Sequence, residues 1–265
     1  MSDSLGDRMK GYENVSRIYL PRRLPVIIRV DGRAFHTLTR GLKKPFDASL
    51  AVSMRSAMFD LCKEISGAKL AYMQSDEISV LVTNDDSIET QPWFDNNLQK
   101  LVSLSASIAT LSFTSAIRRE AECVWSLAKE DDERDYADVL FRAAARATFD
   151  ARAFILPPEE VVNYFIWRQQ DATRNSIQMV AQNLYFHKTL QNKNCNDLQE
   201  MIHEKGINWN DYPTPYKRGT CCVKKQKIID SDTPIVRGQW EFDTDIPVFT
   251  QDRDYIERWL RHDDA

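Results

Sequence analysis

The sequence predicts an α+β fold with a β-α-β-β-α-β core and a more helical second half. Three observations lead to this prediction. A β-branched run at residues 25–30 is followed by a stretch in which apolar residues recur at helical spacing. Two short apolar runs and a long apolar helical stretch come next, and this order is that of the ferredoxin-like, or split β-α-β, plan. Beyond residue 157 the spacing of apolar residues is mostly helical.

The first three strands, and the helix that connects the first two, have clear local signals. Residues 25–30 read Pro-Val-Ile-Ile-Arg-Val, which is typical of a buried strand. Apolar residues at positions 50, 54, 57, 58, 61 and 65 predict a helix over 47–65, with Asp47 as its N-cap. Strands are expected over 70–73 and 78–82, and alternate residues of the later strand share one face.

The next segment completes the expected core. Residues 84–91 are polar and predict a loop, and residues 96–122, rich in Ala, Ser and Leu, predict a long helix. The charged stretch 130–138 indicates either a solvated helix start or a linker. A further strand is expected over 151–156, where two prolines follow it.

The second half of the chain carries weaker signals. Helical spacing extends over 158–192, and a short helix is expected over 198–204. Residues 216–229 predict a strand with basic side chains. After residue 230 few helix signals occur until residues 255–260.

Length and composition limit the class of protein. The 265 residues suffice for one large domain or two small ones. We expect residues 1–135 to form the catalytic region and residues 136–265 a helical lobe and C-terminal segment, packed together as one compact unit. The net charge is −4, from 35 basic and 39 acidic residues, so binding of nucleic acid would depend on local basic patches.

The sequence shows no feature of secretion or of membrane insertion. Residues 1–10 have no apolar run of the signal-peptide kind, and we identify no stretch of the roughly 20 apolar residues that a membrane span needs. The five cysteines form no C-x-x-C pair, which argues against a zinc site, and Cys221 and Cys222 are interpreted as ordinary strand residues and not as a redox pair. We therefore expect a cytoplasmic protein with no membrane partner.

Two aspartates are placed where chemistry could occur. Asp31 directly follows the first strand, and Asp76 lies in the tight turn 74–77 between the next two strands. In a β-α-β-β plan these strands can be neighbours, which would bring the carboxylates together. Carboxylate oxygens are hard ligands that suit Mg²⁺, and Gly32 leaves room for a phosphate and offers its carbonyl. From the local pattern alone, ordinary turn residues remain the alternative.

Several motifs resemble those of the tRNA-histidine guanylyltransferase family, and they match in order and spacing over roughly residues 8–225. They are Arg29-Val-Asp31-Gly32-Arg33-Ala-Phe35-His36, Lys44-Pro45-Phe-Asp47, Tyr72-Met-Gln74-Ser75-Asp76-Glu77, Phe149-Asp150-Ala-Arg152, Trp167-Arg168-Gln169-Gln-Asp171, Asn208-Trp-Asn210 and Tyr216-Lys217-Arg218-Gly219-Thr220. The resemblance implies a polymerase-like palm with a fingers-like helical lobe. It also implies addition of nucleotides to the 5′ end of tRNA in the 3′→5′ direction.

The resemblance also assigns site residues. Asp31, the Gly32 carbonyl and Asp76 would hold two Mg²⁺ ions, and Glu77 would complete the catalytic acidic group, although its role is left open. The residues implied to bind nucleotide are Arg29, Asp31, Gly32, Arg33, Ala34, Phe35, His36, Lys44, Ser75, Asp76, Lys100 and Asn210. GTP or another nucleoside triphosphate and ATP are the implied substrates, and a homotetramer is the implied assembly. His36 is not proposed as a general base.

A polar cluster on the expected helix 158–192 is a candidate contact for tRNA. Arg168, Asp171, Arg174 and Asn175 share a helical face, and guanidinium groups suit RNA phosphates. A salt-bridged surface helix is the alternative. The eukaryotic enzymes of the family carry His-Ile-Asn-Asn where this chain reads Thr-Arg-Asn-Ser at 173–176. The chain therefore resembles the bacterial, phage and archaeal branch that repairs truncated tRNA 5′ ends against a template.

The sequence thus favours a template-dependent nucleotidyltransferase that acts on tRNA, with activation of the 5′ end by ATP. Three alternatives stay open. A histidine-tRNA-specific guanylyltransferase would share all the motifs. A nucleotidyl cyclase-like palm enzyme would share only the metal carboxylates. A tRNA-binding protein without enzymatic activity would retain a catalytically inactive palm fold.

Overall fold

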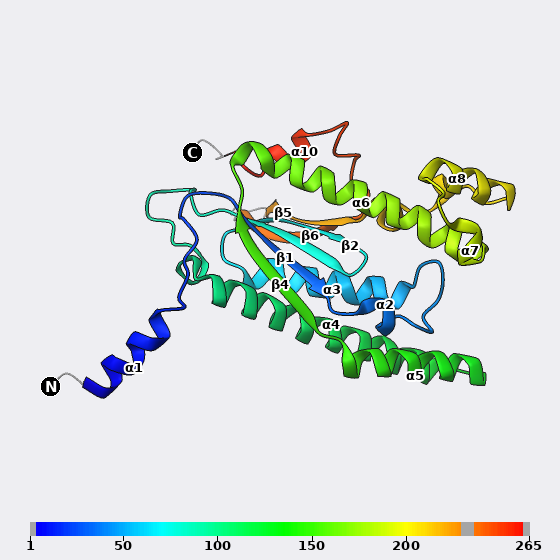
Figure 1. Ribbon diagram of the computed structural model, residues 1–265, viewed down its shortest axis with the longest axis horizontal. Coiled ribbons are helices and arrows are strands. Elements are labelled where there is room, and N and C mark those ends of the chain that lie inside the picture. The colour runs from blue at the N-terminus through cyan, green and yellow to red at the C-terminus, as the bar shows by residue number, and fades with distance from the viewer. Residues whose placement is uncertain (1–3, 229–235, 262–265) are drawn as a thin grey trace.

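A computed structural model describes residues 4–228 and 236–261. It contains one six-stranded antiparallel sheet with helices on both faces (Figure 1). The strands are β1 (Val26–Gly32), β2 (Ala68–Gln74), β3 (Glu77–Val82), β4 (Phe149–Ile155), β5 (Thr220–Ile228) and β6 (Val236–Asp243). The helices are α1 (Ser4–Asn14), α2 (Phe35–Leu38), α3 (Ala48–Glu64), η1 (Trp93–Asn96), α4 (Leu98–Leu127), α5 (Asp131–Arg146), α6 (Pro158–Leu184), α7 (His187–Leu190), α8 (Cys195–Glu204), η2 (Trp209–Asp211), α9 (Thr214–Arg218) and α10 (Asp254–Glu257).

The strand order is β4-β1-β3-β2-β5-β6. Its first four strands have the order of the predicted β-α-β-β-α-β core, with α3 connecting β1 to β2 and α4 with α5 connecting β3 to β4. The expected mixed α and β fold and its strand-helix order are therefore confirmed. β5 then pairs with β2 and carries β6 at the edge of the sheet.

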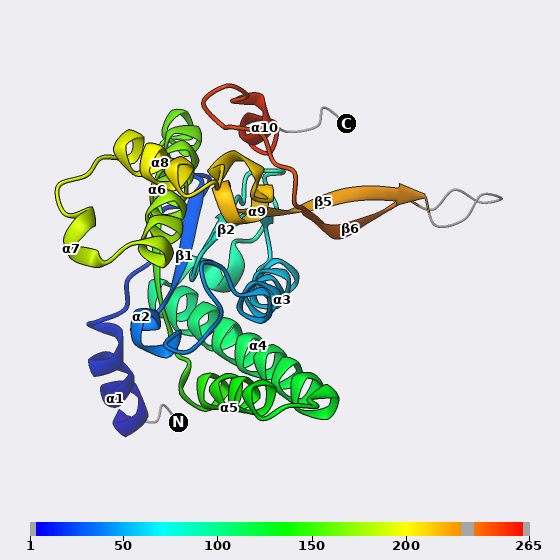
Figure 2. The ribbon, with the colours of Figure 1, turned by 90° about the vertical axis from the view of Figure 1, so that its right-hand side faces the viewer.

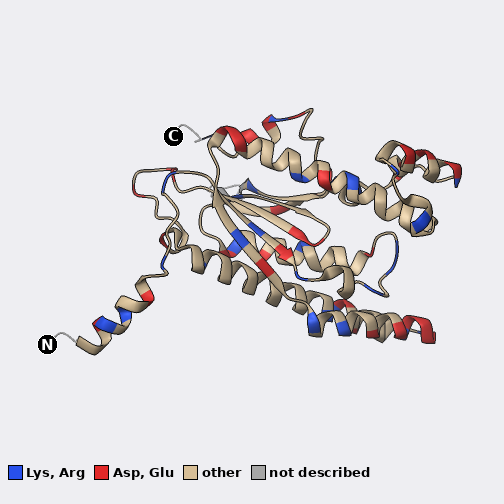
Figure 3. Cartoon of the chain, in the orientation of Figure 1, with Lys and Arg blue, Asp and Glu red and all other residues tan. Residues whose placement is uncertain are grey.

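Several boundaries differ from the sequence prediction. The stretch 130–138 begins the 16-residue helix α5, whose acidic first turn and basic last residue suit the helix dipole (Figure 3). The helical stretch 158–192 is interrupted at Tyr185, between α6 and α7. The elements without a predicted counterpart are α1, β6 and the short elements α2, η1 and η2. α1 and β6 lack a continuous apolar pattern, and β6 pairs along its length with β5.

The alternation of each strand divides the core into two layers. Val26, Ile28 and Val30 face α3, α4 and α5 in the larger cluster, whereas Ile27 faces α6 and the C-terminal segment. Arg29 and Asp31 share the face of Ile27, because side chains alternate along a strand. The end of β1 therefore presents polar side chains toward α6.

Helix α4 is long and apolar enough, by length and composition alone, to cross a membrane. A long helix is expected over 96–122 from the sequence, but a stretch apolar enough to span a membrane is not. One side of α4 packs on α3, α5 and β4, and Phe113 and Ile117 lie fully buried in the core. Its apolar character thus follows from its place in the helical layer of the sheet.

The sheet takes strands from both sides of residue 135, and the proposed division between residues 135 and 136 falls within α5. The boundary between residues 135 and 136 is therefore not a structural one, and the division into a catalytic region and a helical lobe stays a proposal about function. The strand expected over 216–229 is observed as α9 followed by β5, in which Cys221 and Cys222 are buried, unpaired thiols. Beyond β2, the strands β5 and β6 continue as an arm that projects from the body (Figure 2).

Candidate active site

Asp31 and Asp76 meet at one end of the sheet, as β1 and β3 are neighbours. Asp31 lies opposite Glu77 on β3 and opposite Asp150 on β4. The backbone N–H of Gly32 donates to the carbonyl of Asp76 at 3.0 Å, which joins the end of β1 to the β2–β3 turn. Strand pairing thus gathers carboxylates from three strands and one turn.

The two aspartates are held in an environment that disfavours their charged forms. Burial raises the pKa of Asp31, the charge of Asp150 raises it further, and nearby arginines offset part of the effect. Burial likewise raises the pKa of Asp76, and the charge of Asp31 adds to this, against a hydrogen bond from Ser75 that lowers it. A cation placed between Asp31 and Asp76 would relieve both effects.

These residues fit Mg²⁺ better than a transition metal. Two carboxylates and a nearby backbone carbonyl are hard oxygen donors, and Mg²⁺ is typically bound by one or two carboxylates plus substrate phosphates. Within the described part of the chain, no group of three or more His, Cys, Asp or Glu side chains is placed to hold a metal. A site completed by substrate is therefore the arrangement that this chain allows.

A cavity of about 510 Å³ is lined by Asp76 and by Gly32, the residue that follows Asp31. Its lining includes seven residues of the implied nucleotide-binding set, namely Gly32, Ala34, Phe35, His36, Lys44, Ser75 and Asp76. Met179, Gln182 and Asn183 of α6 close the opposite wall. These three residues could not be singled out from the sequence, because no local pattern shows which turn of a long helix passes over a site.

Gly32 is needed here for a steric reason. A Cβ at this position would lie 2.4 Å from Cδ2 of Phe35, closer than side chains tolerate. The Phe35 ring is fixed, with 3% exposure and contacts to the rings of Phe113 and Phe149. Phe35 thus supports the cavity from the core, and its side chain is not free to stack on a base.

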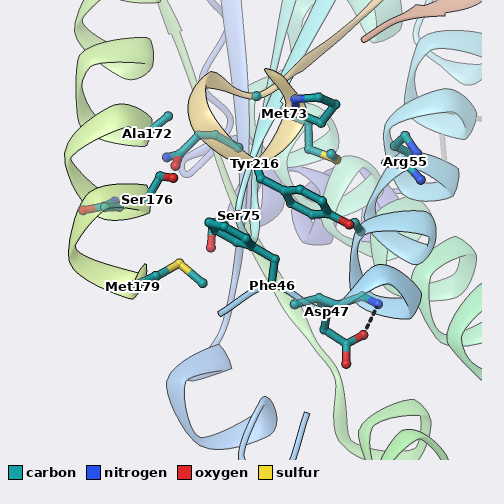
Figure 4. A pocket seen from close by; sticks show the side chains of 15 residues that line it. Phe46, Asp47, Arg55, Met73, Ser75, Ala172, Ser176, Met179 and Tyr216 are labelled. Atoms are coloured by element: carbon teal, nitrogen blue, oxygen red, sulfur yellow. Dashed lines mark hydrogen bonds between the residues drawn. The ribbon is translucent and has the colours of Figure 1, made fainter. Parts of the chain in front are cut away.

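A smaller cavity of about 90 Å³ shares part of its lining with the first one and is more apolar. Figure 4 shows the side chains that line the smaller cavity. Both cavities share Asp47, Leu50, Ser75 and Met179. In the smaller one the rings of Phe46 and Tyr216 stack, with centroids 4.7 Å apart and planes 13° apart. A polar cavity continuous with an apolar one suits a ligand with a charged end and a flat ring.

Asp47 organises the loop between the two cavities. One of its oxygens accepts from the Leu50 N–H at 2.9 Å, as expected of an N-cap, and the other accepts from the Lys43 N–H at 2.9 Å. The hydroxyl of Tyr136 on α5 donates to that second oxygen at 2.7 Å. Tyr136 was not singled out from the sequence, since it lies in a charged stretch with no motif.

The similarity to known proteins agrees with this geometry. A profile of the Thg1 family, described as tRNAHis guanylyltransferase, matches residues 6–157. That match covers more than half of the chain. The chain belongs to the Thg1 family.

Solved structures and curated relatives extend this Thg1 match. A bacterial tRNA(HIS) guanylyltransferase (Thg1)-like protein in complex with ATP has 46% identity and a TM-score of 0.82, covering 98% of this chain and 100% of that one. The corresponding complex with GTP has 45% identity and a TM-score of 0.78, covering 97% and 99%. The tRNA(His) guanylyltransferase of Debaryomyces hansenii is 27% identical over 214 residues, which are 76% of this chain and 73% of the relative. This Thg1 chain is thus a nucleotidyltransferase by family.

The structure corrects the expected tRNA contact of Arg168. This residue is 6% exposed and donates to both carboxylate oxygens of Glu77, from Nε at 2.7 Å and from Nη2 at 2.8 Å. It therefore lies on the buried face of α6, against Glu77 of β3, and its side chain is not exposed to RNA. Asp171 is mostly covered as well, and it accepts from Arg168, Arg174 and Asn175. Arg174 is the exposed member of the cluster.

Five residues of the implied nucleotide set line neither cavity, namely Arg29, Asp31, Arg33, Lys100 and Asn210. Lys100 is on the first turn of α4, over the ring of Phe94. Backbone hydrogen bonds join the start of α4 to residues 18–20, which precede β1. Lys100 therefore lies toward the end of the sheet where β1 begins, away from Asp31. Asn210 is exposed in η2, where its carbonyl accepts from Lys217. Arg33 is exposed, and Arg29 lies on β1 under α6 with its Nε buried and without a partner.

Proposed function

We propose that this Thg1-family chain adds nucleotides to the 5′ end of tRNA in the 3′→5′ direction, directed by the opposing template base. We further propose that its role is repair of truncated 5′ ends. The observation that carries the proposal is the pair of adjoining cavities at Asp76 and Gly32, whose linings include many residues of the family motifs. The similar bacterial structures in complex with ATP and with GTP support nucleotide binding by this chain.

Each cavity suits one part of a nucleoside triphosphate. The larger cavity has the cations Lys43 and Lys44 on one wall and Asp76 on another, so it would receive the triphosphate. The smaller cavity has the stacked rings of Phe46 and Tyr216, and it would receive the base. Ser75 lies at the junction and would meet the part of the nucleotide between them.

Asp31, Asp76 and the Gly32 carbonyl would hold Mg²⁺, two ions per site in our proposal. When bound, Mg²⁺ in such sites lowers the pKa of an attacking hydroxyl and neutralises charge on the leaving group. In the proposed reaction the 3′-hydroxyl of the incoming nucleotide loses its proton to solvent and its oxygen forms a bond to the activated 5′ phosphorus of the tRNA. The bond from that phosphorus to the leaving group breaks, which releases pyrophosphate from a 5′-triphosphate end or AMP from an end activated by ATP. The protein contributes mainly position and charge. Activation of a 5′-monophosphate end would use ATP.

The repair assignment depends on the segment 173–176. It reads Thr-Arg-Asn-Ser in place of His-Ile-Asn-Asn, which the family resemblance associates with histidine-tRNA identity. In α6, Arg174 is exposed and available to an RNA phosphate, whereas Ser176 is buried and accepts a hydrogen bond from Trp209. We also propose that a fingers-like role belongs to α6–α9 and that the protein assembles as a homotetramer.

The carboxylates are tested by substitution. Asp31→Ala and Asp76→Ala are assayed for transfer of labelled GTP to a tRNA that lacks its first nucleotide, with Asp138→Ala, exposed on α5, as the control. We expect losses of at least a hundredfold for the first two and none for the third. A folded Asp76→Ala protein with near-normal activity would contradict the proposal.

A second candidate is histidine-tRNA-specific guanylylation, which the description of the matching family favours. A substrate survey separates the two functions. Histidine and non-histidine tRNAs are presented both full-length and lacking the first nucleotide. Repair predicts a preference for truncated ends and dependence on base pairing with the template. Strict dependence on the histidine anticodon would replace repair by the second candidate, and a cyclic product from GTP alone would indicate a cyclase.

A further inference from the structure

A chain of four charged side chains leads from the catalytic turn to the surface of α6. Glu77 begins β3 directly after Asp76, and the guanidinium of Arg168 grips both its oxygens, at 2.7 and 2.8 Å. Nη2 of Arg168 also donates to Asp171 at 3.0 Å, and Asp171 accepts from Arg174. The exposed fraction of the side chain rises along this chain, from 8% for Glu77 and 7% for Arg168 to 18% for Asp171 and 58% for Arg174.

This arrangement leaves Glu77 little freedom to act on a substrate. Each of its carboxylate oxygens already accepts a charge-assisted hydrogen bond, in the two-bond geometry that makes Arg–carboxylate pairs specific in direction. The pair is buried, so moving Glu77 toward a metal would leave a guanidinium without its main partner. Glu77 also faces α6, on the same face of the sheet as Asp31.

The turn beside Glu77 needs support. Ser75 has φ of 50°, a left-handed conformation that a non-glycine residue keeps only where its surroundings hold it. Ser75 and Asp76 are the only residues between the end of β2 and the start of β3. The direction of the Asp76 side chain therefore depends on how the first residue of β3 is fixed.

We propose that Arg168 is a positioning residue and that Glu77 is its anchor. Together they hold the Ser75–Asp76 turn against α6, so that Asp76 faces Asp31. This inference rests on the proposed function in one respect, that Asp31 and Asp76 are the metal-binding carboxylates. It removes Glu77 from the catalytic residues and gives it a structural reason for following Asp76.

The chain offers a matched control one step along the same strand and helix. Ser79 of β3 and Tyr164 of α6 are joined by a buried hydrogen bond of 2.8 Å between their hydroxyl groups. Tyr164→Phe therefore loosens the same two elements, but two residues further from Asp76 than the Arg168 contact. A general packing role for α6 would make this variant behave like the Arg168 variants.

The test is a double-mutant cycle of Glu77→Leu, Arg168→Met and the two together, with Tyr164→Phe as control. For each protein we measure kcat and KM for GTP on truncated tRNA, binding of Mn²⁺ in the presence of GTP but without tRNA by electron paramagnetic resonance, and the melting temperature. We expect each single variant to lower kcat about a hundredfold, the effect of a misplacement near 1 Å, and to weaken Mn²⁺ binding. The double variant should recover at least tenfold in kcat over either single variant, because no buried charge is left unpaired.

Three results would overturn the proposal. A double variant no more active than Glu77→Leu would make Glu77 catalytic. A folded Arg168→Met protein with normal kcat and Mn²⁺ binding would show that Arg168 positions nothing. A Tyr164→Phe protein as impaired as Arg168→Met would reduce the contact to packing.

The results can still be interpreted if some variants do not fold or if the proposed function is wrong. Should the single variants not fold, the double variant decides alone, since a folded but inactive double variant contradicts the proposal and an active one supports it. Should wild-type protein add no nucleotide to any tRNA, the proposed function fails, while Mn²⁺ binding by the four proteins still tests the anchor.

Discussion

Replacing Gly32 with alanine tests how closely the nucleotide cavity depends on the core beneath it. The new Cβ would lie 2.4 Å from Cδ2 of Phe35 and 2.6 Å from its Cγ. The ring cannot move aside, because Phe113 and Phe149 pack against it with centroids 5.4 and 5.1 Å away. The backbone of Gly32 must shift, and its hydrogen bond to Asp76 shifts with it.

The size of the effect follows from overpacking. An extra methyl group in a packed region costs about 1–3 kcal/mol in the free energy of unfolding. For a chain of this size, that corresponds to a fall of roughly 2–12 °C in the melting temperature. Because Gly32 adjoins Asp31, a displacement near 1 Å should lower kcat/KM for GTP on the order of a hundredfold.

The assay combines thermal denaturation with labelled GTP addition. Gly11→Ala is the matched control, since a Cβ there would meet nothing within 4 Å. Adding Phe35→Leu to Gly32→Ala makes room for the methyl group and should restore part of the lost activity. A Gly32→Ala protein with unchanged melting temperature and activity would refute the steric argument.

Three further predictions concern the same cavity. Tyr136→Phe removes the hydroxyl that donates to buried Asp47, a charge-assisted hydrogen bond of about 1.5–3 kcal/mol. KM for GTP should therefore rise about tenfold with little change in kcat. Equal KM values for the variant and wild type in steady-state assays would contradict this prediction. Lys44→Gln removes a cation from the wall of the larger cavity and should raise KM for GTP roughly tenfold, whereas Lys10→Gln on exposed α1 should leave it unchanged. The folded-state pKa of Asp76 lies above its unfolded value, so the folded state binds more protons between the two values and stability falls as pH rises through that window. Asp76→Asn should therefore be more stable than wild type at pH 8 without Mg²⁺, and the difference in stability should disappear as pH is lowered to the ordinary pKa of aspartate. Thermal denaturation at several pH values measures this difference. A difference that is constant with pH, or a less stable variant at pH 8, would contradict the prediction.

The elements with strong local signals could be predicted from the sequence. Residues 25–30 have a β-branched run, and the α3 helix has both apolar spacing and an N-cap, so neighbours along the chain already define them. The turn at Ser75 and Asp76 was also expected. β6 could not be predicted in this way, because its stability comes from pairing with β5 and not from its own pattern.

The site was predictable in part. The motifs around Gly32, Lys44 and Asp76 indicated residues that do line one cavity. Arg168 was interpreted as an RNA contact because it is charged. Its position three residues after Phe165 and four before Ala172 nevertheless places it on the buried stripe of α6, and this spacing was the signal that could have shown it.

By itself, then, the sequence determined the order of strands and helices, the two aspartates and the family motifs, since these depend on residues close together in the chain. Only the tertiary structure decided which groups touch. Asp31 lies opposite both Glu77 and Asp150, and Arg168 reaches Glu77 across 91 positions of sequence. Such contacts depend on strand register and on which helix face is buried, and both are settled only when the whole sheet packs.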